Sequence, residues 1–434
     1  MPRPAGSNQR ALIIGGGASG LAAACILSQQ QVPFLLLEKE ARPGRKLLAT
    51  GNGRCNLMNL GEPVFFGDSG FANAVLSRCG SAETGRFFNS IGLEFFEEEL
   101  GRAYPNSRQA ASVLDCLLAC IESAGVGKII TGARAEIIKR AGQGWRVQAG
   151  GQTHEAPCLV IATGGPAAPR LGGDAGLLQE LVRLGHSLRP FFPALCALNT
   201  QNKPLKGLAG QRAYACLALE QGGRPVCAAA GELLFTEEGL SGLCAMQLAR
   251  DAREGLDRGL KVEVRVDFSP LLGTAPATMG RLNPAEVSTP ARKAAALALL
   301  KERAGRLGPE RVYTGLLPRA MGARLENLTM EQAADWLTSL RLQVTGTRGF
   351  DHAQVAAGGL DCGQFDPHTL RSLLHPGLYA CGEALNVDGD TGGYNLLFAW
   401  ASGILAARDI AREETAGQSS TSTALHQPTT DRRP

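Results

Sequence analysis

A pattern that ends at Glu38 constrains the fold of this 434-residue chain more than any other feature. A short apolar run over residues 11–14 leads into the sequence GGGASG, and an apolar helical stretch and a second apolar run over residues 32–37 follow. Strand, G-x-G-x-x-G turn, helix, strand and acidic residue, in this order, are typical of a dinucleotide-binding unit. The turn alone is weak evidence, but the complete order favours dinucleotide binding over a glycine-rich turn in an ordinary α/β fold.

Each position in this pattern has a physical role. Gly15 permits the tight turn, Gly17 lets a pyrophosphate approach the backbone, and Gly20 lets the helix pack closely on the strand. The helix start presents unpaired N–H groups and partial positive charge to the phosphates. The Glu38 carboxylate can bind both ribose hydroxyls and repels a 2′-phosphate, which favours FAD or NAD over NADP. The contacts expected in this segment are Gly15, Gly17, Ala18, Ser19, Gly20 and Glu38.

The segment after Glu38 favours a flavin over a nicotinamide. It contains the loop GRKLLATGNGRCN at residues 44–56, whose glycines and amides can surround a ring system with backbone N–H groups. Arg45 and Lys46 can neutralise a diphosphate or the N1/C2=O region of a reduced flavin. The alternative is a surface loop with solvated basic residues. The contacts expected here are Lys39, Arg45, Lys46, Gly51, Gly53, Arg54 and Asn56.

Two later segments repeat the pattern of an apolar strand followed by glycine, at residues 159–165 and 377–383. The second leads into DGDTGGYN and a helix of small residues, so a second positive helix start is expected near the flavin O2 edge. Both chain ends therefore build one cofactor domain, and the middle of the chain is inserted into it.

The inserted part changes character along its length. Residues 191–268 alternate short apolar runs with glycine and charged turns, which predicts antiparallel strands. Residues 270–338 show helical periodicity. Lys293, Lys301, Arg303 and Arg306 are interpreted as the solvated face of one of these helices. The Ser/Thr/Gln/Pro-rich residues 413–434 have no apolar pattern and are expected to be disordered.

Four segments together resemble one bacterial flavoprotein family: GGGASGLAAA, GRKLLATGNGRCN, GELLFTEEGLSG and PGLYACGEALNVDGDTGGYNLLFAWASG. The family is that of aminoacetone oxidase and the BaiN/RdsA-type FAD-dependent oxidoreductases, and the motifs extend from residue 11 to about residue 408. The resemblance implies an α/β fold with a glutathione-reductase-like, FAD-binding Rossmann domain formed by residues 1–190 and 346–412. It also implies a β-barrel-like insert of residues 191–269 and 339–345, which carries a nested helical domain of residues 270–338.

The resemblance also assigns cofactor contacts outside the first motif. Ala135 matches the position where the backbone meets adenine, and Thr163 and Gly164 match the turn near the diphosphate. Gly382 and Glu383 match the ribityl-diphosphate end. The loop and helix start over the flavin are matched by Gly392, Gly393, Tyr394, Asn395 and Leu396. The chain departs from the family pattern at residues 49–53, 239–243 and 355–359, so a relative's substrate does not transfer directly.

Catalytic residues are not identified by any pattern in the sequence. The candidates are Cys55, His352, Asp390 and Tyr394. Arg54 can lower the pKa of the adjacent Cys55, and the alternative is a packed structural thiol. His352 has no evident partner and is more typical of a structural or exposed histidine.

The twelve cysteines include no C-x-x-C pair, so neither a metal site nor a dithiol centre is expected. The closest pair, Cys116 and Cys120, is interpreted as two buried thiols on one helix face. This cysteine usage favours a reducing cytoplasm. No second G-x-G-x-x-G occurs, so NADH or NADPH is expected to dock transiently at the exposed ring face.

Charge and hydropathy exclude several classes of partner. The net charge of +4 is small, and no Lys/Arg-rich tract occurs, so no nucleic-acid partner is expected. Glycines interrupt the apolar run at residues 11–27, which argues against a signal peptide, and no uninterrupted apolar stretch of membrane-spanning length occurs. The expected partner is a small-molecule substrate, and the oligomeric state stays open.

The function predicted from the sequence is that of an FAD-dependent oxidoreductase whose flavin is reduced by NADH or NADPH and which acts on a small organic substrate. An oxygen-dependent oxidase of amines or aminoketones is the first alternative. A flavin-bearing redox sensor with little turnover is an alternative of another class. An RNA-modifying flavoprotein is a further one, against which the modest charge counts.

Overall fold

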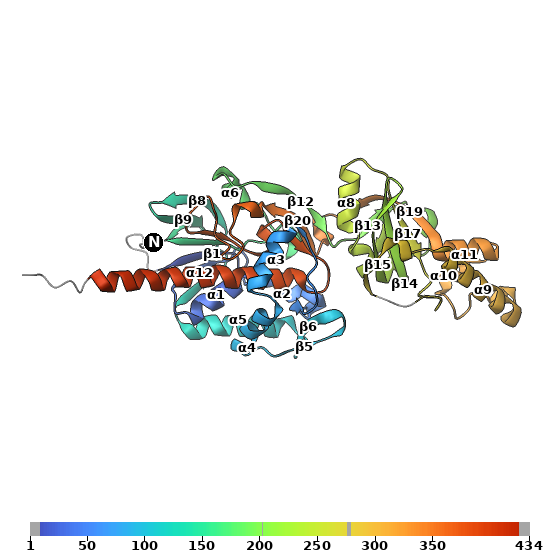
Figure 1. Cartoon of the computed structure of the whole chain (residues 1–434), viewed down its shortest axis with the longest axis horizontal. Coiled ribbons are helices and arrows are strands. Elements are labelled where there is room, and N and C mark those ends of the chain that lie inside the picture. Colours follow the sequence, from blue (N-terminus) through green and yellow to red (C-terminus); the bar gives the residue numbers. More distant parts are fainter. Residues whose placement is uncertain (1–8, 202, 276–278, 425–434) are drawn as a thin grey trace, which may run out of the picture. The chain divides into compact units, whose positions relative to one another are not determined.

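The computed structural model describes residues 9–201, 203–275 and 279–424, and the chain divides into two compact units (Figure 1). Unit 1 comprises residues 1–191 and 357–434, and unit 2 comprises residues 192–356. The sequence placed the second boundary between residues 345 and 346. The structure assigns residues 346–356 to unit 2 instead, because Gly346 and Thr347 at the end of strand β19 (Leu340–Thr347) pair with strand β13 (Leu198–Thr200).

Unit 1 is built on a five-stranded parallel sheet. The order is β21 (Leu378–Ala380), β11 (Cys158–Ile161), β1 (Ala11–Ile14), β2 (Phe34–Leu37) and β7 (Gly127–Ile130). Four of the five strands, β21, β11, β1 and β2, are buried along their whole length, as expected for a parallel sheet covered on both faces. This arrangement confirms the predicted Rossmann-type α/β fold.

Helices and a second small sheet surround this parallel sheet. Helix α1 (Ala18–Gln29) packs against α5 (Ala110–Ala124) and α12 (Tyr394–Ala424). A three-stranded antiparallel sheet is formed by β8 (Ala135–Ala141), β9 (Gly144–Ala149) and β10 (Gln152–Ala156). The remaining elements of unit 1, with the two strands that continue into unit 2, are α2 (Arg45–Ala49), β3 (Met58–Asn59), β4 (Phe65–Gly67), α3 (Ser69–Arg78), α4 (Ser81–Ser90), β5 (Phe95–Glu97), β6 (Arg102–Pro105), α6 (Leu178–Arg183), β12 (Leu188–Ala194), β20 (Val355–Leu360) and β22 (Val387–Gly389).

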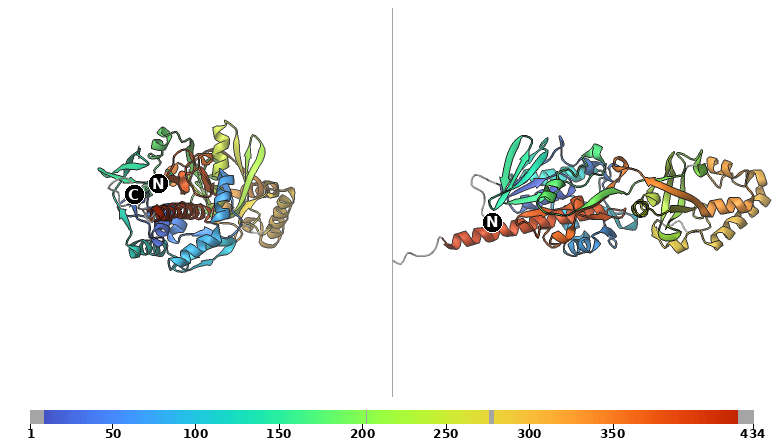
Figure 2. Two further views of the ribbon diagram at one scale, coloured as in Figure 1. Left: turned by 60° about the vertical axis from the view of Figure 1, so that its left-hand side comes forward. Right: turned by 90° about the horizontal axis from the view of Figure 1, so that it is seen from above.

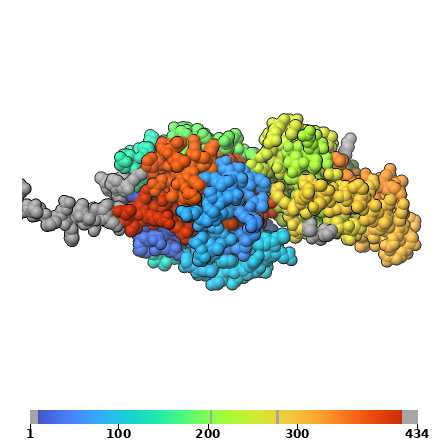
Figure 3. Space-filling view, in the orientation of Figure 1, coloured from blue at the N-terminus to red at the C-terminus, as the bar shows by residue number. Residues whose placement is uncertain are grey.

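Both ends of the chain contribute to unit 1, as the sequence predicted. Figure 3 shows N-terminal residues in blue and C-terminal residues in red side by side on one surface, and α12 packs against α3 and α4. No helix in the described residues is both long enough and apolar enough to cross a membrane.

Unit 2 contains a six-stranded antiparallel barrel. The ring runs through β14 (Arg212–Gln221), β17 (Val262–Asp267), β19, β13, β16 (Gly239–Ser241) and β15 (Arg224–Phe235), and β15 pairs with β14 to close it. Short helices α7 (Leu243–Met246) and α8 (Ala249–Asp257) follow β16. The closed ring confirms the predicted barrel-like insert.

A helical subdomain lies between β17 and β19 in the sequence and at one end of the barrel (Figure 2). It consists of α9 (Pro290–Leu307), α10 (Arg319–Leu325) and α11 (Met330–Ser339). The helices begin at Pro290 rather than near residue 270, because β18 (Gly280–Leu282) still pairs with β15. Lys293 and Lys301 of α9 form ion pairs with Asp335 and Glu331 of α11, which fits the solvated face expected for this helix.

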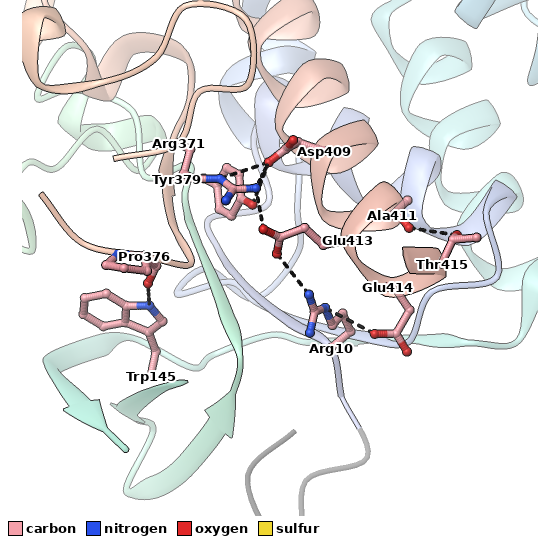
Figure 4. A network of polar contacts seen from close by, with 10 residues as sticks. All are labelled: Arg10, Trp145, Arg371, Pro376, Tyr379, Asp409, Ala411, Glu413, Glu414 and Thr415. Carbon is pink, nitrogen blue, oxygen red and sulfur yellow. Dashed lines mark hydrogen bonds and ion pairs between the residues drawn. The ribbon is translucent and has the colours of Figure 1, made fainter. Parts of the chain in front are cut away.

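The C-terminal helix extends beyond the point at which the sequence predicts disorder. α12 continues through Glu413 and Glu414 to Ala424, and residues 425–434 lie outside the described part of the chain. The physical reason is a partner near the other end of the chain (Figure 4). The guanidinium of Arg10, whose side chain is only 1% exposed, lies 3.1 Å from a Glu413 carboxylate oxygen and 3.3 Å from one of Glu414.

The same network continues to strand β21. Arg371 pairs with Asp409 at 2.5 Å and with Glu413 at 2.6 Å, and the Tyr379 hydroxyl donates a 2.9 Å hydrogen bond to Asp409. Burial raises the pKa of the Tyr379 hydroxyl, so that it stays a donor. The network therefore joins the beginning of β1, strand β21 and the later turns of α12.

Replacing Arg10 by methionine tests this anchor. The variant removes the buried guanidinium that pairs with Glu413 and Glu414, and breaking a buried ion pair costs about 3 kcal/mol of unfolding free energy. Urea unfolding followed by circular dichroism measures the loss. Arg412→Met, at an exposed position of the same helix, is the matched control and should change stability by less than about 0.5 kcal/mol. Equal stabilities of the two variants would contradict the anchoring role.

Candidate functional site

The glycine-rich turn after β1 depends on backbone contacts closer than side chains allow. Gly15 has a φ of +106°, and a Cβ atom there would lie 2.4 Å from the Ala162 carbonyl oxygen. A Cβ at Gly20 would lie 1.9 Å from the Gly15 carbonyl oxygen. The structure thus gives these two glycines the roles that the sequence predicts for the turn and for helix packing.

Gly17 differs from its neighbours because it faces open space. It is the N-cap of α1, and a Cβ atom built on it would meet no atom of the described structure within 4 Å. No described side chain caps this helix start, where the first N–H groups have no partners within the helix itself. Ala18 and Ser19 form the first turn, and Ser19 is buried beneath Gly382. An open space in front of a helix N-terminus fits a diphosphate.

Glu38 follows β2 at the carboxyl edge of the sheet. Its Oε2 accepts a 2.6 Å hydrogen bond from the Gly16 amide, and its Oε1 accepts one of 2.8 Å from the Glu40 amide. Its carbonyl oxygen accepts a hydrogen bond from the Ala133 amide, two residues before the predicted adenine contact Ala135 at the start of β8. Two backbone amides therefore fix the carboxylate, and its contact with a ribose stays a prediction.

Three of the predicted segments meet at Glu383. Its Oε2 accepts a 2.6 Å hydrogen bond from Lys46 Nζ and one of 3.2 Å from the Gly165 amide, next to Thr163 and Gly164. Lys46 and Glu383 are 337 positions apart in the sequence. The structure thus brings together the basic loop and both strand-to-glycine turns, as expected if both chain ends build one cofactor domain.

The other basic residues of this region have protein partners. Arg45 pairs with Glu40 and donates a 3.0 Å hydrogen bond to the Arg170 carbonyl oxygen. Lys39 lies 3.3 Å from Asp174. Lys46 is therefore the cation of this group that meets residues from the other predicted cofactor segments.

The flavin-side loop combines a left-handed backbone with an unpartnered polar atom. The short 3-10 helix at Thr50–Gly53 has left-handed residues at Gly51 and Asn52. After it, the Oδ1 atom of Asn56 is buried and has no hydrogen-bond partner in the described structure. A bound ligand with an N–H or O–H group can satisfy this acceptor, since buried polar atoms are seldom left without a partner.

The start of α12 is fixed against this loop. A Cβ atom at Gly393 would lie 2.6 Å from the Met58 carbonyl carbon, and Asn59 Nδ2 donates a 2.9 Å hydrogen bond to the Gly392 carbonyl oxygen. Asn395 closes the turn, because its side chain accepts from the Gly389 amide and donates to the Gly389 carbonyl oxygen, both at 2.8 Å. Leu396 is the half-buried next residue of the helix. Asn59 carries no signal in the sequence that points to this role.

The four catalytic candidates are distributed over both units, with His352 in unit 2 and the other three in unit 1. Burial raises the pKa of Cys55 to about 12, so the prediction that Arg54 lowers this pKa is wrong. The Arg54 guanidinium instead lies 4.3 Å from the centre of the Tyr104 ring and 2.7 Å from Glu98. His352 is exposed in a short turn of unit 2, while Cys55 belongs to unit 1.

Asp390 and Tyr394 lie close together near the start of α12. Asp390 is buried and accepts a 2.8 Å hydrogen bond from the Thr391 amide. Burial, and then the charges of Asp390 and Glu62, raise the pKa of the Tyr394 hydroxyl, so it is a proton donor at neutral pH. No group of three or more His, Cys, Asp or Glu residues that could hold a metal ion occurs in the described residues.

Replacing Gly17 by alanine tests the open space at the turn. Its φ of −84° and ψ of −167° suit alanine, so we expect a folded protein in which the new methyl group blocks the diphosphate. FAD affinity should fall at least tenfold, or about 1.4 kcal/mol, as measured by flavin fluorescence titration. Gly20→Ala is the contrasting variant, because its clash with Gly15 should destabilise the fold. Unchanged FAD affinity in Gly17→Ala would contradict the assignment.

Comparisons with known proteins show the family to which the chain belongs. The model of the HI0933-like protein Rossmann domain matches residues 9–409. The chain is 36% identical over 419 residues to the 3-dehydro-bile acid Δ(4,6)-reductase of Clostridium scindens, covering 92% of this chain and 98% of that protein. It is 30% identical over 414 residues to the ribosomal RNA dihydrouridine synthase of Escherichia coli, covering 92% and 97%.

Among solved structures, 3-ketosteroid Δ1-dehydrogenase from Sterolibacterium denitrificans has a TM-score of 0.50 at 12% identity, covering 93% of this chain and 99% of that one. This likeness concerns the fold. The match of the family model to nearly the whole chain and the identity to the two bacterial enzymes confirm the resemblance found in the sequence. The chain therefore belongs to the HI0933-like family, and it is an FAD-dependent oxidoreductase.

Proposed function

We propose that this protein is a reductase that transfers a hydride to a carbon–carbon double bond conjugated to a carbonyl group, with NADH or NADPH as the electron donor. One observation carries the proposal. Two relatives that match the chain along nearly its whole length act on very different molecules, yet their names describe the same bond chemistry. One reduces a double bond of a 3-dehydro bile acid, and the other makes dihydrouridine, in which the double bond beside a uracil carbonyl is saturated.

The chain's own residues provide the setting for such a step. Bound FAD supplies the hydride chemistry, and the protein positions and tunes the cofactor. The open N-terminus of α1 at Gly17 fits the diphosphate, and the Asn56 Oδ1 acceptor fits a donor group of the ligand. The first turn of α12 stabilises negative charge placed before it, because the helix dipole is positive there. Tyr394, at that helix start, keeps its proton and is a candidate donor to the substrate.

The electron donor follows from the organisation of the sequence. The chain has one G-x-G-x-x-G motif, and FAD is proposed to occupy it. NADH or NADPH then binds transiently beside the flavin and leaves before the substrate enters. The proposed location of this chemistry is the cytoplasm, which supplies reduced nicotinamide and suits a protein whose twelve cysteines form no disulfide.

Anaerobic mixing of the FAD-loaded protein with NADH or NADPH tests the reductase proposal. We expect flavin absorbance near 450 nm to decrease rapidly with one of the two donors, and a conjugated cyclic enone, added next, to restore it. Tyr394→Phe should slow the second phase about 10²-fold and leave the first unchanged, because loss of a positioned proton donor affects only substrate reduction. Bleaching by aminoacetone but by neither nicotinamide would instead support the oxidase alternative. A flavin that no donor reduces would support the sensor.

An RNA base is the second candidate substrate, and the distribution of charge along the chain supports it. Unit 1 contains 24 Lys/Arg and 24 Asp/Glu residues, whereas unit 2 contains 20 and 16, so the whole net charge of +4 lies in unit 2. An excess of positive charge on one unit favours a polyanionic partner. The relatives from Escherichia coli and Haemophilus influenzae that act on ribosomal RNA also support this candidate.

The two substrate classes are separated by one comparison. The FAD-loaded protein is incubated with its electron donor and either unmodified ribosomal RNA or a conjugated cyclic enone, and products are measured by mass spectrometry. We expect reduction of the enone and no gain of two mass units in uridine. Formation of dihydrouridine, with turnover that falls steeply as salt concentration rises, would establish the RNA candidate instead.

A further inference from the structure

The cysteines that are closest in the sequence are not the ones that meet in space. Cys116 and Cys120 are one turn apart on α5, but Cys120 contacts Cys25 of α1. The Cys25 thiol lies 3.3 Å from the Leu117 carbonyl oxygen, and the Cys120 sulfur lies 4.0 Å from the Cys25 carbonyl oxygen. The interaction between the two thiol groups raises the pKa of Cys25 and lowers that of Cys120. Two thiols that are 95 positions apart thus form a pair between two packed helices.

Exposure to solvent differs among the twelve cysteines. Ten of the twelve cysteines are buried, and only Cys116 and Cys120 are half-buried. Cys25 is completely buried in the core of unit 1. Cys120 is therefore the half-buried cysteine that contacts Cys25, whereas Cys116 is half-buried and lies one turn away on the same helix.

The pKa values of the two half-buried thiols are shifted in opposite directions. The interaction with the Cys25 thiol lowers the pKa of Cys120 and raises that of Cys25. Burial, and then the charge of Asp115, raise the pKa of Cys116. Because the thiolate is the reactive form, Cys120 is the more nucleophilic of the two at neutral pH.

We propose that Cys25 and Cys120 form a redox-active pair that closes to a disulfide between α1 and α5 when the protein meets hydrogen peroxide. In the first step the Cys120 thiolate attacks one peroxide oxygen, the O–O bond breaks, and protonation of the leaving hydroxide gives a sulfenic acid and water. In the second step the Cys25 sulfur attacks the Cys120 sulfur, the S–O bond breaks, and a second water leaves. Two thiols are oxidised by two electrons in total, and one peroxide is reduced to two waters.

The proposed disulfide would fix α1, the helix that begins at the glycine-rich turn, to α5. α1 starts beside Gly17, and Cys25 lies on the same helix two turns later. The bond joins this helix to α5 and closes a long loop of the chain, which restricts the unfolded state. Oxidation is therefore expected to stabilise unit 1, with Tm rising by several degrees, and to protect the half of the protein that holds the cofactor site.

The test treats the full-length protein with hydrogen peroxide, alkylates the remaining thiols, and identifies cross-linked tryptic peptides by mass spectrometry. We expect a peptide containing Cys25 joined to the peptide of residues 109–128 in the wild type and in Cys116→Ser, and none in Cys120→Ser or Cys25→Ala. Cys116→Ser is the matched control, because it removes the other half-buried thiol of the same helix. It also removes the ambiguity of a peptide that contains both cysteines.

Alkylation rates and Tm provide two further tests of the proposal. In the reduced protein, the variants Cys116→Ser and Cys120→Ser each keep one half-buried thiol that can be alkylated. Alkylation of Cys120 in the Cys116→Ser variant should be several times faster than alkylation of Cys116 in the Cys120→Ser variant. Tm should rise on oxidation in the wild type and in Cys116→Ser but not in Cys120→Ser, whose reduced form should unfold like the reduced wild type. A stable sulfenic acid at Cys120 without a cross-link, equal alkylation rates, or a Cys116–Cys120 bond would each overturn the proposal.

Discussion

Close contact between backbones, without intervening side chains, determines how the cofactor half of this protein is arranged. The turn after β1 meets the chain after β11 at Gly15, and α1 meets that turn at Gly20. On the other side of α1, a Cβ at Gly403 of α12 would lie 2.2 Å from the Ser19 carbonyl oxygen. The first turn of α1 is thus enclosed by backbone on both sides. Its N–H groups cannot turn away from a ligand, since no flexible side chain separates the helix from its neighbours.

The same requirement explains why α12 is fixed at two distant places. Its start is fixed by the paired hydrogen bonds between Asn395 and Gly389, and its later turns are fixed by Asp409, Glu413 and Glu414. A helix rises about 1.5 Å per residue and is stiff over this length. The ion pairs with Arg10 therefore contribute to the position of the first turn, although they lie many turns away from it. Burying the Arg10 charge without a partner costs free energy, because the charge loses its hydration. The carboxylates must therefore reach Arg10, and only one register of the helix places them there.

The parts of the molecule that the sequence predicted are those coded by neighbouring residues. The strand, turn, helix and acid up to Glu38 form one continuous pattern, and the alternation in residues 191–268 is a local property of each strand. The expectations that failed depended on a distant partner. Glu413 falls within the stretch that the sequence predicts to be disordered, because its partner Arg10 lies 403 positions away. The sequence also predicts that Arg54 lowers the pKa of Cys55, but Arg54 pairs with Glu98, 44 positions away, and burial raises that pKa.

The backbone of the glycine turn and the side chains around it have different effects on substrate choice. Gly15, Gly17 and Gly20 act through the absence of side chains, so they can fix a dinucleotide but cannot distinguish one substrate from another. The departures from the family pattern lie elsewhere, at residues 49–53, 239–243 and 355–359. The last of these lies in β20 and is buried, and a Cβ at Gly359 would lie 2.6 Å from the Leu385 carbonyl carbon, just before β22 and the turn that Asn395 closes. Substitution along this strand therefore changes the neighbourhood of the segment that leads to the flavin-side helix, without altering the three glycines of the cofactor turn.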